Sequence, residues 1–194
     1  IKEGQRLIST FGNSPMGYSL PAAIGAAFAR PSQRVVCLDG DGGFQLNIQE
    51  LQTVAYYRLP IKFFIMNNQS MGIIKQFQDA YFGSRYHATV PEHGYAAPDF
   101  VKIAESYGIP AFSVSRLKDA DKAIERALVS DGPMLVNVMI DVAQKLTPKL
   151  EFGRPLEDMS PYLDREELKK AMIVPLLPES KTIPENKGWV NLAQ

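Results

Sequence analysis

The chain has 194 residues, 45% of them hydrophobic, and its 21 basic and 21 acidic side chains leave no net formal charge. This length favours one domain that buries about 70% of the surface of its unfolded chain. The balanced charge argues against nucleic acid or an anionic membrane as a partner, and no apolar run approaches the ~20 residues that cross a bilayer. The single cysteine, Cys37, excludes an internal disulfide, so we expect a cytoplasmic protein.

Apolar runs and helical periodicities alternate along most of the chain. Strands are expected at residues 7–9, 34–38, 61–66, 111–114 and 134–140. Helices are expected at residues 21–30, 47–57, 71–82, 99–107 and 118–129. Strands that alternate with helices predict parallel βαβ units. The expected fold class is therefore α/β, a doubly wound, mostly parallel sheet with helices on both faces.

This regular pattern ends near residue 143, and we expect residues 1–143 to form the folded domain. Residues 144–194 are rich in proline and charge and contain one short helical pattern, at residues 164–172. This irregular C-terminal tail is expected either to pack as a lid or arm, or to be partly disordered.

Two polar residues follow neighbouring strands of the expected sheet. Asp41 lies in the run GDGG at residues 40–43, and Asn68 lies in the run NNQS at residues 67–70. A strand, a returning helix and a parallel strand place both residues at one sheet edge, where neighbouring strands lie about 4.8 Å apart. A carboxylate and an amide oxygen at this spacing suit a small hard cation. The glycines beside Asp41 let backbone N–H groups approach a phosphate.

The chain carries GDG at residues 40–42, ELQT at 50–53, LPI at 59–61 and NN at 67–68. This series resembles the motif of thiamine diphosphate-dependent enzymes, in particular that of the acetolactate synthase branch. A second stretch, MGYSLPAAIGA at residues 16–26, is similar to the segment that holds the aminopyrimidine ring in the same enzymes. The two stretches occur in the order and at the spacing of the family.

The resemblance implies thiamine diphosphate and Mg²⁺ as cofactors. The metal ligands would be the side chains of Asp41 and Asn68 and the backbone carbonyl of Ser70, where the family often has an acidic residue. The backbone N–H groups of Gly42 and Gly43 would meet the phosphates, together with those of Met71 and Gly72 at the start of the helix expected from residue 71. The residues assigned to cofactor binding are Ser14, Met16, Gly40, Asp41, Gly42, Gly43, Asn68, Ser70, Met71, Gly72 and Ile73.

The resemblance also assigns catalytic roles to Ser14 and Met16. Met16 matches the bulky apolar residue that holds the cofactor in a bent shape, and the Ser14 carbonyl matches the acceptor of its 4'-amino group. The family usually has Gly-Thr where this chain has Ser14-Pro15. Phe77 matches a tryptophan that shapes the substrate pocket of acetolactate synthases, and ordinary core packing is an equal alternative for it.

The activating glutamate of the family comes from a pyrimidine-binding domain, and no glutamate of this chain has a matching context. We therefore expect a fragment, a proteolysis product or half of a split enzyme that is inactive alone. The pyrimidine-binding and linking domains of the family have no counterpart in this chain. Its partner would be the pyrimidine-binding domain of the same or a partner subunit, within a homodimer or homotetramer.

The function implied is that of a 2-keto acid carboligase or decarboxylase similar to acetolactate synthase. Two alternatives stay open. The chain could belong to another thiamine diphosphate enzyme, such as a simple 2-keto acid decarboxylase or a sugar-pathway carboligase. It could also be a non-catalytic diphosphate-binding module. A dinucleotide dehydrogenase is disfavoured, because no G-x-G-x-x-G turn follows a strand.

Overall fold

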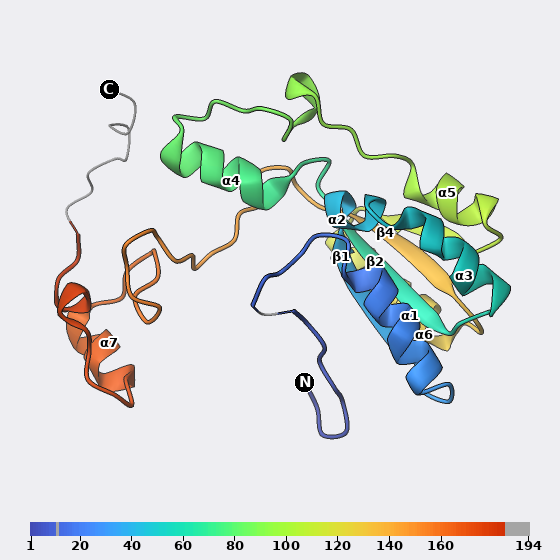
Figure 1. The fold of residues 1–194 in the computed structure, drawn as a ribbon, viewed down its shortest axis with the longest axis horizontal. Helices are drawn as coiled ribbons and strands as arrows, with labels where there is room; N and C mark the ends of the chain where they lie inside the picture. Colours follow the sequence, from blue (N-terminus) through green and yellow to red (C-terminus); the bar gives the residue numbers. More distant parts are fainter. Residues whose placement is uncertain (11, 185–194) are drawn as a thin grey trace. The chain divides into compact units, whose positions relative to one another are not determined.

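The computed structural model describes residues 1–10 and 12–184. The chain divides into two compact units, both drawn in Figure 1. One is formed by Ile1–Met71 with His87–Gln144, and the other by Gly72–Tyr86 with Lys145–Gln194. Every helix among the described residues is too short or too polar to cross a membrane.

A parallel sheet forms the centre of the first unit. Its strands, in spatial order, are β1 (Val35–Gly40), β2 (Ile61–Asn67), β4 (Met134–Met139) and β3 (Ala111–Val114). Every neighbouring pair is parallel, which confirms the predicted α/β class. β1 and β2 stay in register to their carboxyl ends, so the residues that follow them leave from the same edge of the sheet.

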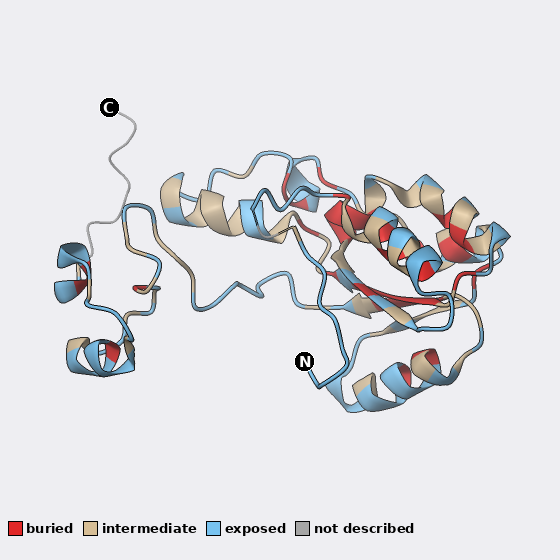
Figure 2. Cartoon of the chain, turned by 60° about the horizontal axis from the view of Figure 1, so that its bottom comes forward, coloured by how far each residue is buried: buried red, intermediate tan, exposed pale blue. Residues whose placement is uncertain are grey.

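Helices cover both faces of this sheet. α1 (Ser19–Ala29), α3 (Leu51–Tyr56) and α5 (Phe100–Ser106) pack on one face, and α6 (Ala120–Val129) packs on the other. The larger core includes Leu20, Leu51, Phe63, Ile65 and Phe100. The smaller core contains Phe64, Ala127, Met134 and Val136. Figure 2 shows the buried residues along the strands and on the helix sides that face them.

Residues 7–9 do not form the predicted strand. Leu7 and Ile8 are 62% and 54% exposed, and no described strand pairs with them. A strand is stabilised by hydrogen bonds and side-chain pairs with a neighbouring strand. The prediction is wrong because this short apolar run pairs with neither edge strand of the sheet, β1 or β3.

The helix predicted at residues 47–57 is divided into a 3₁₀ turn, η1 (Ile48–Glu50), and α3. Asn47 has a non-helical backbone, with φ −131° and ψ 30°, and its Nδ2 atom donates to the Gly17 carbonyl at 2.6 Å. A further short helix that was not predicted, α2 (Asp41–Gln45), follows β1 directly. The other elements of the first unit lie where the sequence placed them, with small shifts at their ends. Short 3₁₀ turns, η2 (Pro91–His93) and η3 (Leu117–Asp119), complete this unit.

The second unit contains α4 (Gly72–Tyr81) and the C-terminal tail. On α4 the ring centroid of Phe77 lies 4.7 Å from that of Tyr81 and 5.2 Å from that of Phe152 in the tail. The backbone N–H of Phe152 donates to the Tyr81 hydroxyl at 3.2 Å. The first part of the tail is therefore packed on the aromatic side of this helix.

A buried carboxylate organises the rest of the tail. Asp158 is 1% exposed and forms ion pairs with Arg154 and Arg165. Arg165 also donates to the Ser180 carbonyl at 2.9 Å, which connects α7 (Arg165–Ala171) to η4 (Pro178–Lys181). The described part of the tail thus has a hydrogen-bonded structure with α7 at the predicted helix, and residues 185–194 lie outside the described residues.

Lys62 lies within β2 and is 1% exposed. Its Nζ atom donates to the Ser130 carbonyl at 2.7 Å, to Ser130 Oγ at 2.9 Å and to the Gly132 carbonyl at 2.5 Å. Burial lowers the pKa of Lys62, and the charge of Arg34 lowers it further. The ammonium nevertheless uses all three of its donors, as a buried charge requires. It satisfies backbone carbonyls just beyond the last turn of α6.

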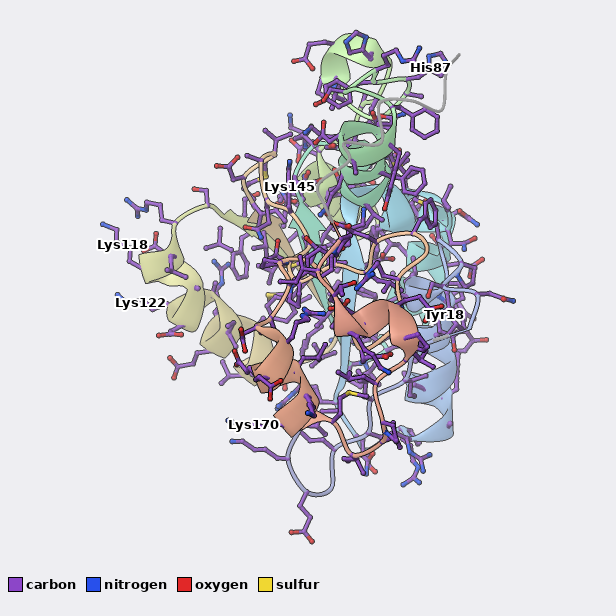
Figure 3. All side chains as sticks on the ribbon, turned by 90° about the vertical axis from the view of Figure 1, so that its left-hand side faces the viewer. Tyr18, His87, Lys118, Lys122, Lys145 and Lys170 are labelled. Carbon is purple, nitrogen blue, oxygen red and sulfur yellow. The ribbon has the colours of Figure 1, made fainter. Side chains whose placement is uncertain are left out.

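Replacement of Lys62 by methionine should lower the free energy of unfolding by about 1–3 kcal/mol, because the stem stays while buried carbonyls lose their donor. The shift of the urea midpoint measures this loss. Lys122→Met is the matched control, since this lysine projects from α6 away from the sheet (Figure 3). Equal midpoints for the two variants would contradict the role given to Lys62.

Candidate functional site

Asp41 and Asn68 meet at the carboxyl ends of β1 and β2. Asp41 is the first residue of α2 and is 3% exposed, and Asn68 directly follows β2. The backbone N–H of Ser70 donates to Asp41 Oδ2 at 3.2 Å and to Asn68 Oδ1 at 3.1 Å. The two side-chain oxygens therefore lie close together, as the strand order predicted, and they converge on one N–H group.

Two carboxyl groups share this edge of the sheet. Asp39 Oδ1 accepts the Gly40 N–H at 2.8 Å, whereas its Oδ2 is buried without a hydrogen-bond partner among the described residues. Burial raises the pKa of the Asp39 carboxyl, and the charge of Asp41 also raises it. Burial raises the pKa of Asp41 as well, against the effect of the Tyr95 hydroxyl and of nearby backbone N–H groups. Electrostatics at this edge favours a cation.

The oxygens near Asp41 suit a hard divalent cation. The Asp41 carboxylate, the Asn68 amide oxygen and the Ser70 carbonyl are the kinds of ligand that Mg²⁺ takes, with water in its other positions. Within residues 1–10 and 12–184, no group of three or more His, Cys, Asp or Glu side chains could hold a metal. A cation at this edge would therefore depend on neutral oxygens beside one carboxylate. The residues present fit Mg²⁺, and their roles as ligands stay a prediction.

Gly42 and Gly43 are required by their neighbours in the protein. A Cβ atom on Gly42 would lie 2.6 Å from Met71 Sδ and 3.4 Å from Met16 Cε, and one on Gly43 would overlap Asp39 Oδ1. Neither position admits a side chain unless these atoms move. The sequence suggested glycines that make room for a phosphate. The structure shows that Met71 occupies the space where a side chain at residue 42 would lie, and that Asp39 does so for residue 43.

The segment that carries Met16 lies beside the same turn. The Met16 side chain is 47% exposed, and its methyl group faces Gly42. Gly17 adopts φ +83°, a conformation that favours glycine. Its carbonyl accepts the bond from Asn47, and a Cβ on Gly17 would lie 2.9 Å from that same Nδ2 atom. Asn47 therefore fixes the position of this segment, a role that helical periodicity could not reveal.

Ser14 takes a left-handed backbone conformation, with φ 42°. Its N–H and its Oγ both donate to the Thr10 carbonyl, at 2.9 and 3.3 Å. A non-glycine residue with positive φ is uncommon and marks local strain. This turn sets the direction of the Ser14 carbonyl, the group that was predicted to accept a cofactor amino group.

A loop of residues 88–97 also contacts the site. The Thr89 carbonyl accepts Ser70 Oγ at 2.9 Å and the Met71 N–H at 3.0 Å. The Met71 N–H, which was predicted to meet a phosphate, is therefore bonded to Thr89 in this structure. Tyr95 in the same loop is only 7% exposed. A large aromatic residue between glycine and small residues was the one signal that could have pointed to this loop.

Three other predicted residues belong to the second unit. Gly72 and Ile73 begin α4, and Ile73 is 63% exposed. Phe77 packs against the aromatic rings of α4 and the tail, as described above. These contacts agree with core packing for Phe77, and its contact with a substrate stays a prediction.

Comparison with known proteins finds relatives of this chain. The sequence profile of "Thiamine pyrophosphate enzyme, C-terminal TPP binding domain" matches residues 1–138. The acetolactate synthase large subunit of Cyanidium caldarium is 40% identical over 160 residues, which are 82% of this chain and 27% of that protein. The isozyme 2 large subunit of Escherichia coli (strain K12) is 37% identical over 155 residues, 80% of this chain and 28% of that protein.

A solved structure is similar as well. It is the thiamine diphosphate-dependent 4-hydroxybenzoylformate decarboxylase of Rhodococcus jostii RHA1, with a TM-score of 0.58 and 32% identity over 65% of this chain and 23% of that one. The chain thus spans about a quarter of the length of these relatives. Its fold, its pair of polar strand ends and its profile match agree, and the chain belongs to the family of C-terminal TPP-binding domains of thiamine pyrophosphate enzymes.

Proposed function

We propose that this chain is the cofactor-binding part of a 2-keto acid carboligase or decarboxylase similar to acetolactate synthase. The family match gives thiamine diphosphate with Mg²⁺ as the cofactor. The observation that carries the proposal is the convergence of the Asp41 and Asn68 oxygens on the Ser70 N–H. This convergence supports the proposal that one cation binds both oxygens.

The binding residues have distinct tasks in this proposal. Asp41 and Asn68, with the Ser70 carbonyl, bind Mg²⁺. The N–H groups of Gly42 and Gly43, in the first turn of α2, would bind the diphosphate, because N–H groups at helix starts favour anions. The Met71 N–H is the least suited of the predicted donors, since it is bonded to Thr89.

Other residues of the chain orient the reacting part of the cofactor. Thiamine diphosphate, when bound, supplies the electron sink that decarboxylation of a 2-keto acid needs. Met16 supports the bent shape of the bound cofactor through its exposed side chain. The Ser14 carbonyl accepts the 4'-amino group, in a direction fixed by the strained turn at Thr10 and Ser14. Both residues act on the cofactor and not on the substrate.

The activity of the whole protein also needs groups that this chain does not provide in a recognisable context. We propose that a pyrimidine-binding domain of the same or a partner subunit supplies the activating glutamate, in a cytoplasmic homodimer or homotetramer. Synthase relatives near 40% identity favour a carboligase. The similar decarboxylase structure supports simple 2-keto acid decarboxylation as the second candidate.

Removal of the Asp41 carboxylate should abolish Mg²⁺-dependent cofactor binding. We expect Asp41→Asn to weaken the binding of thiamine diphosphate by more than about 100-fold, because even the outer partners of metal ligands contribute 10–100-fold. Calorimetric titration of the intact protein measures this affinity. Asp121→Asn, an exposed change on α6, should bind like the unmodified protein. Undiminished affinity in Asp41→Asn would reject this residue as a ligand.

Shortening the Met16 side chain should affect activation of the cofactor more than its binding. With Met16→Ala we expect slower exchange of the C2 proton of bound thiamine diphosphate, followed by NMR in deuterated water, and a smaller change in affinity. Met16→Leu keeps the bulk and should exchange nearly as fast as the unmodified protein. An unchanged exchange rate in Met16→Ala would exclude the supporting role.

Incubation of the intact protein with pyruvate, thiamine diphosphate and Mg²⁺ should distinguish the two candidate activities. A carboligase joins two pyruvate molecules with loss of one CO₂, so acetolactate should accumulate. A simple decarboxylase should release acetaldehyde and CO₂ instead. Cofactor binding without either product would favour the non-catalytic diphosphate-binding module.

A further inference from the structure

The loop of residues 88–97 holds the two turns of the site from one side. Its Thr89 carbonyl accepts bonds from the turn after β2, as described above. Its Ala96 carbonyl accepts Gln45 Nε2 from α2 at 3.2 Å. Inside the loop, the Tyr95 N–H donates to the Val90 carbonyl at 3.1 Å. One short segment therefore connects the turns that carry Asp41 and Ser70.

Tyr95 brings a polar group from this loop to the carboxylate. The side chain is 7% exposed, and its hydroxyl oxygen is buried without a hydrogen bond of good geometry among the described residues. The Asp41 carboxylate and the Gln45 side chain both face this hydroxyl. A phenol hydroxyl carries one proton that it can donate.

A buried hydroxyl that lacks a full hydrogen bond destabilises the folded protein. A phenylalanine at this position would keep the ring in place and avoid that cost. The hydroxyl is therefore unexplained by packing, and the Asp41 carboxylate, which accepts but does not donate, interacts with it. Carboxylates that bind metals are themselves held by hydrogen bonds from neighbouring residues, which fix their orientation.

We propose that Tyr95 is a positioning residue for the cation site, whose hydroxyl donates to the Asp41 carboxylate and orients it toward the metal. The Gln45 side chain, which donates to the Ala96 carbonyl, also interacts with this hydroxyl. In this proposal Gln45 donates to the hydroxyl oxygen and leaves the hydroxyl proton for Asp41. The Ser70 N–H holds Asp41 Oδ2. This inference rests on the proposed function, because it concerns the site where Mg²⁺ is expected.

The test is the affinity of the intact protein for Mg²⁺ in the presence of thiamine diphosphate, measured by calorimetry. We expect Tyr95→Phe to raise the dissociation constant of Mg²⁺ by about 10–100-fold, with the amount of cofactor bound at saturating Mg²⁺ unchanged. The thermal midpoint without metal should not fall below that of the unmodified protein, because the ring is kept and the incompletely bonded hydroxyl is removed. Tyr56→Phe, at a residue that is 75% exposed, should leave the affinity unchanged.

Each outcome decides a separate point. An unmodified protein that binds neither Mg²⁺ nor thiamine diphosphate overturns the proposed function. An unmodified protein that binds both, with Tyr95→Phe equal to it in Mg²⁺ affinity, overturns only the role of Tyr95. If Tyr95→Phe does not fold, Gln45→Met decides instead. This change removes the side-chain amide that interacts with the Tyr95 hydroxyl, and residue 45 is partly exposed, so the substitution should be tolerated. Weaker Mg²⁺ binding in that variant supports the inference, and unchanged binding rejects it.

Discussion

The candidate site depends on one backbone N–H group, that of Ser70, which is shared between a carboxylate and an amide oxygen. A shared donor gives each acceptor a weaker bond than an undivided one, but it holds both oxygens on the same side of the turn. β1 and β2 bring Asp41 and Asn68 to the same sheet edge, and Ser70 then fixes their side chains. Metal-binding side chains that are ordered before binding lose little conformational freedom when a cation binds. The affinity of the site for a cation therefore depends on the fold of the sheet that orders them.

The loops around these strand ends are held mostly by bonds between side chains and backbone. Asn47 binds the carbonyl of Gly17, and Ser70 binds the carbonyl of Thr89. In each case a polar residue at the end of one element fixes a loop that is distant in sequence. This arrangement is typical of α/β proteins, in which a rigid sheet positions the loops and the loops carry the binding and catalytic residues. Lys62 serves the frame in the same way, since it satisfies carbonyls beyond the end of α6.

Local sequence predicted the features that depend on local physics. The apolar run of β2 and the polar pair at Asp41 and Asn68 followed from periodicity, strand order and motif spacing. The strand predicted at Leu7 and Ile8 does not form, because a strand is stabilised by pairing with another strand and a local sequence does not show whether that pairing occurs. The break at Asn47 and the burial of Tyr95 could not be predicted, because each depends on atoms that only the folded chain brings near. The conformation of Asn47 and the burial of Tyr95 depend on contacts with residues far away in the sequence, and not on the helix or strand propensity of the local sequence.

Gly42 and Gly43 mark a geometrical limit set by the protein itself, since Met71 and Asp39 occupy the places where side chains would project. A side chain at either position would require Met71 or Asp39 to move, whether or not a cofactor is bound. These two glycines therefore reflect contacts inside the protein, and their presence alone does not distinguish a chain that binds a cofactor from one that has lost it.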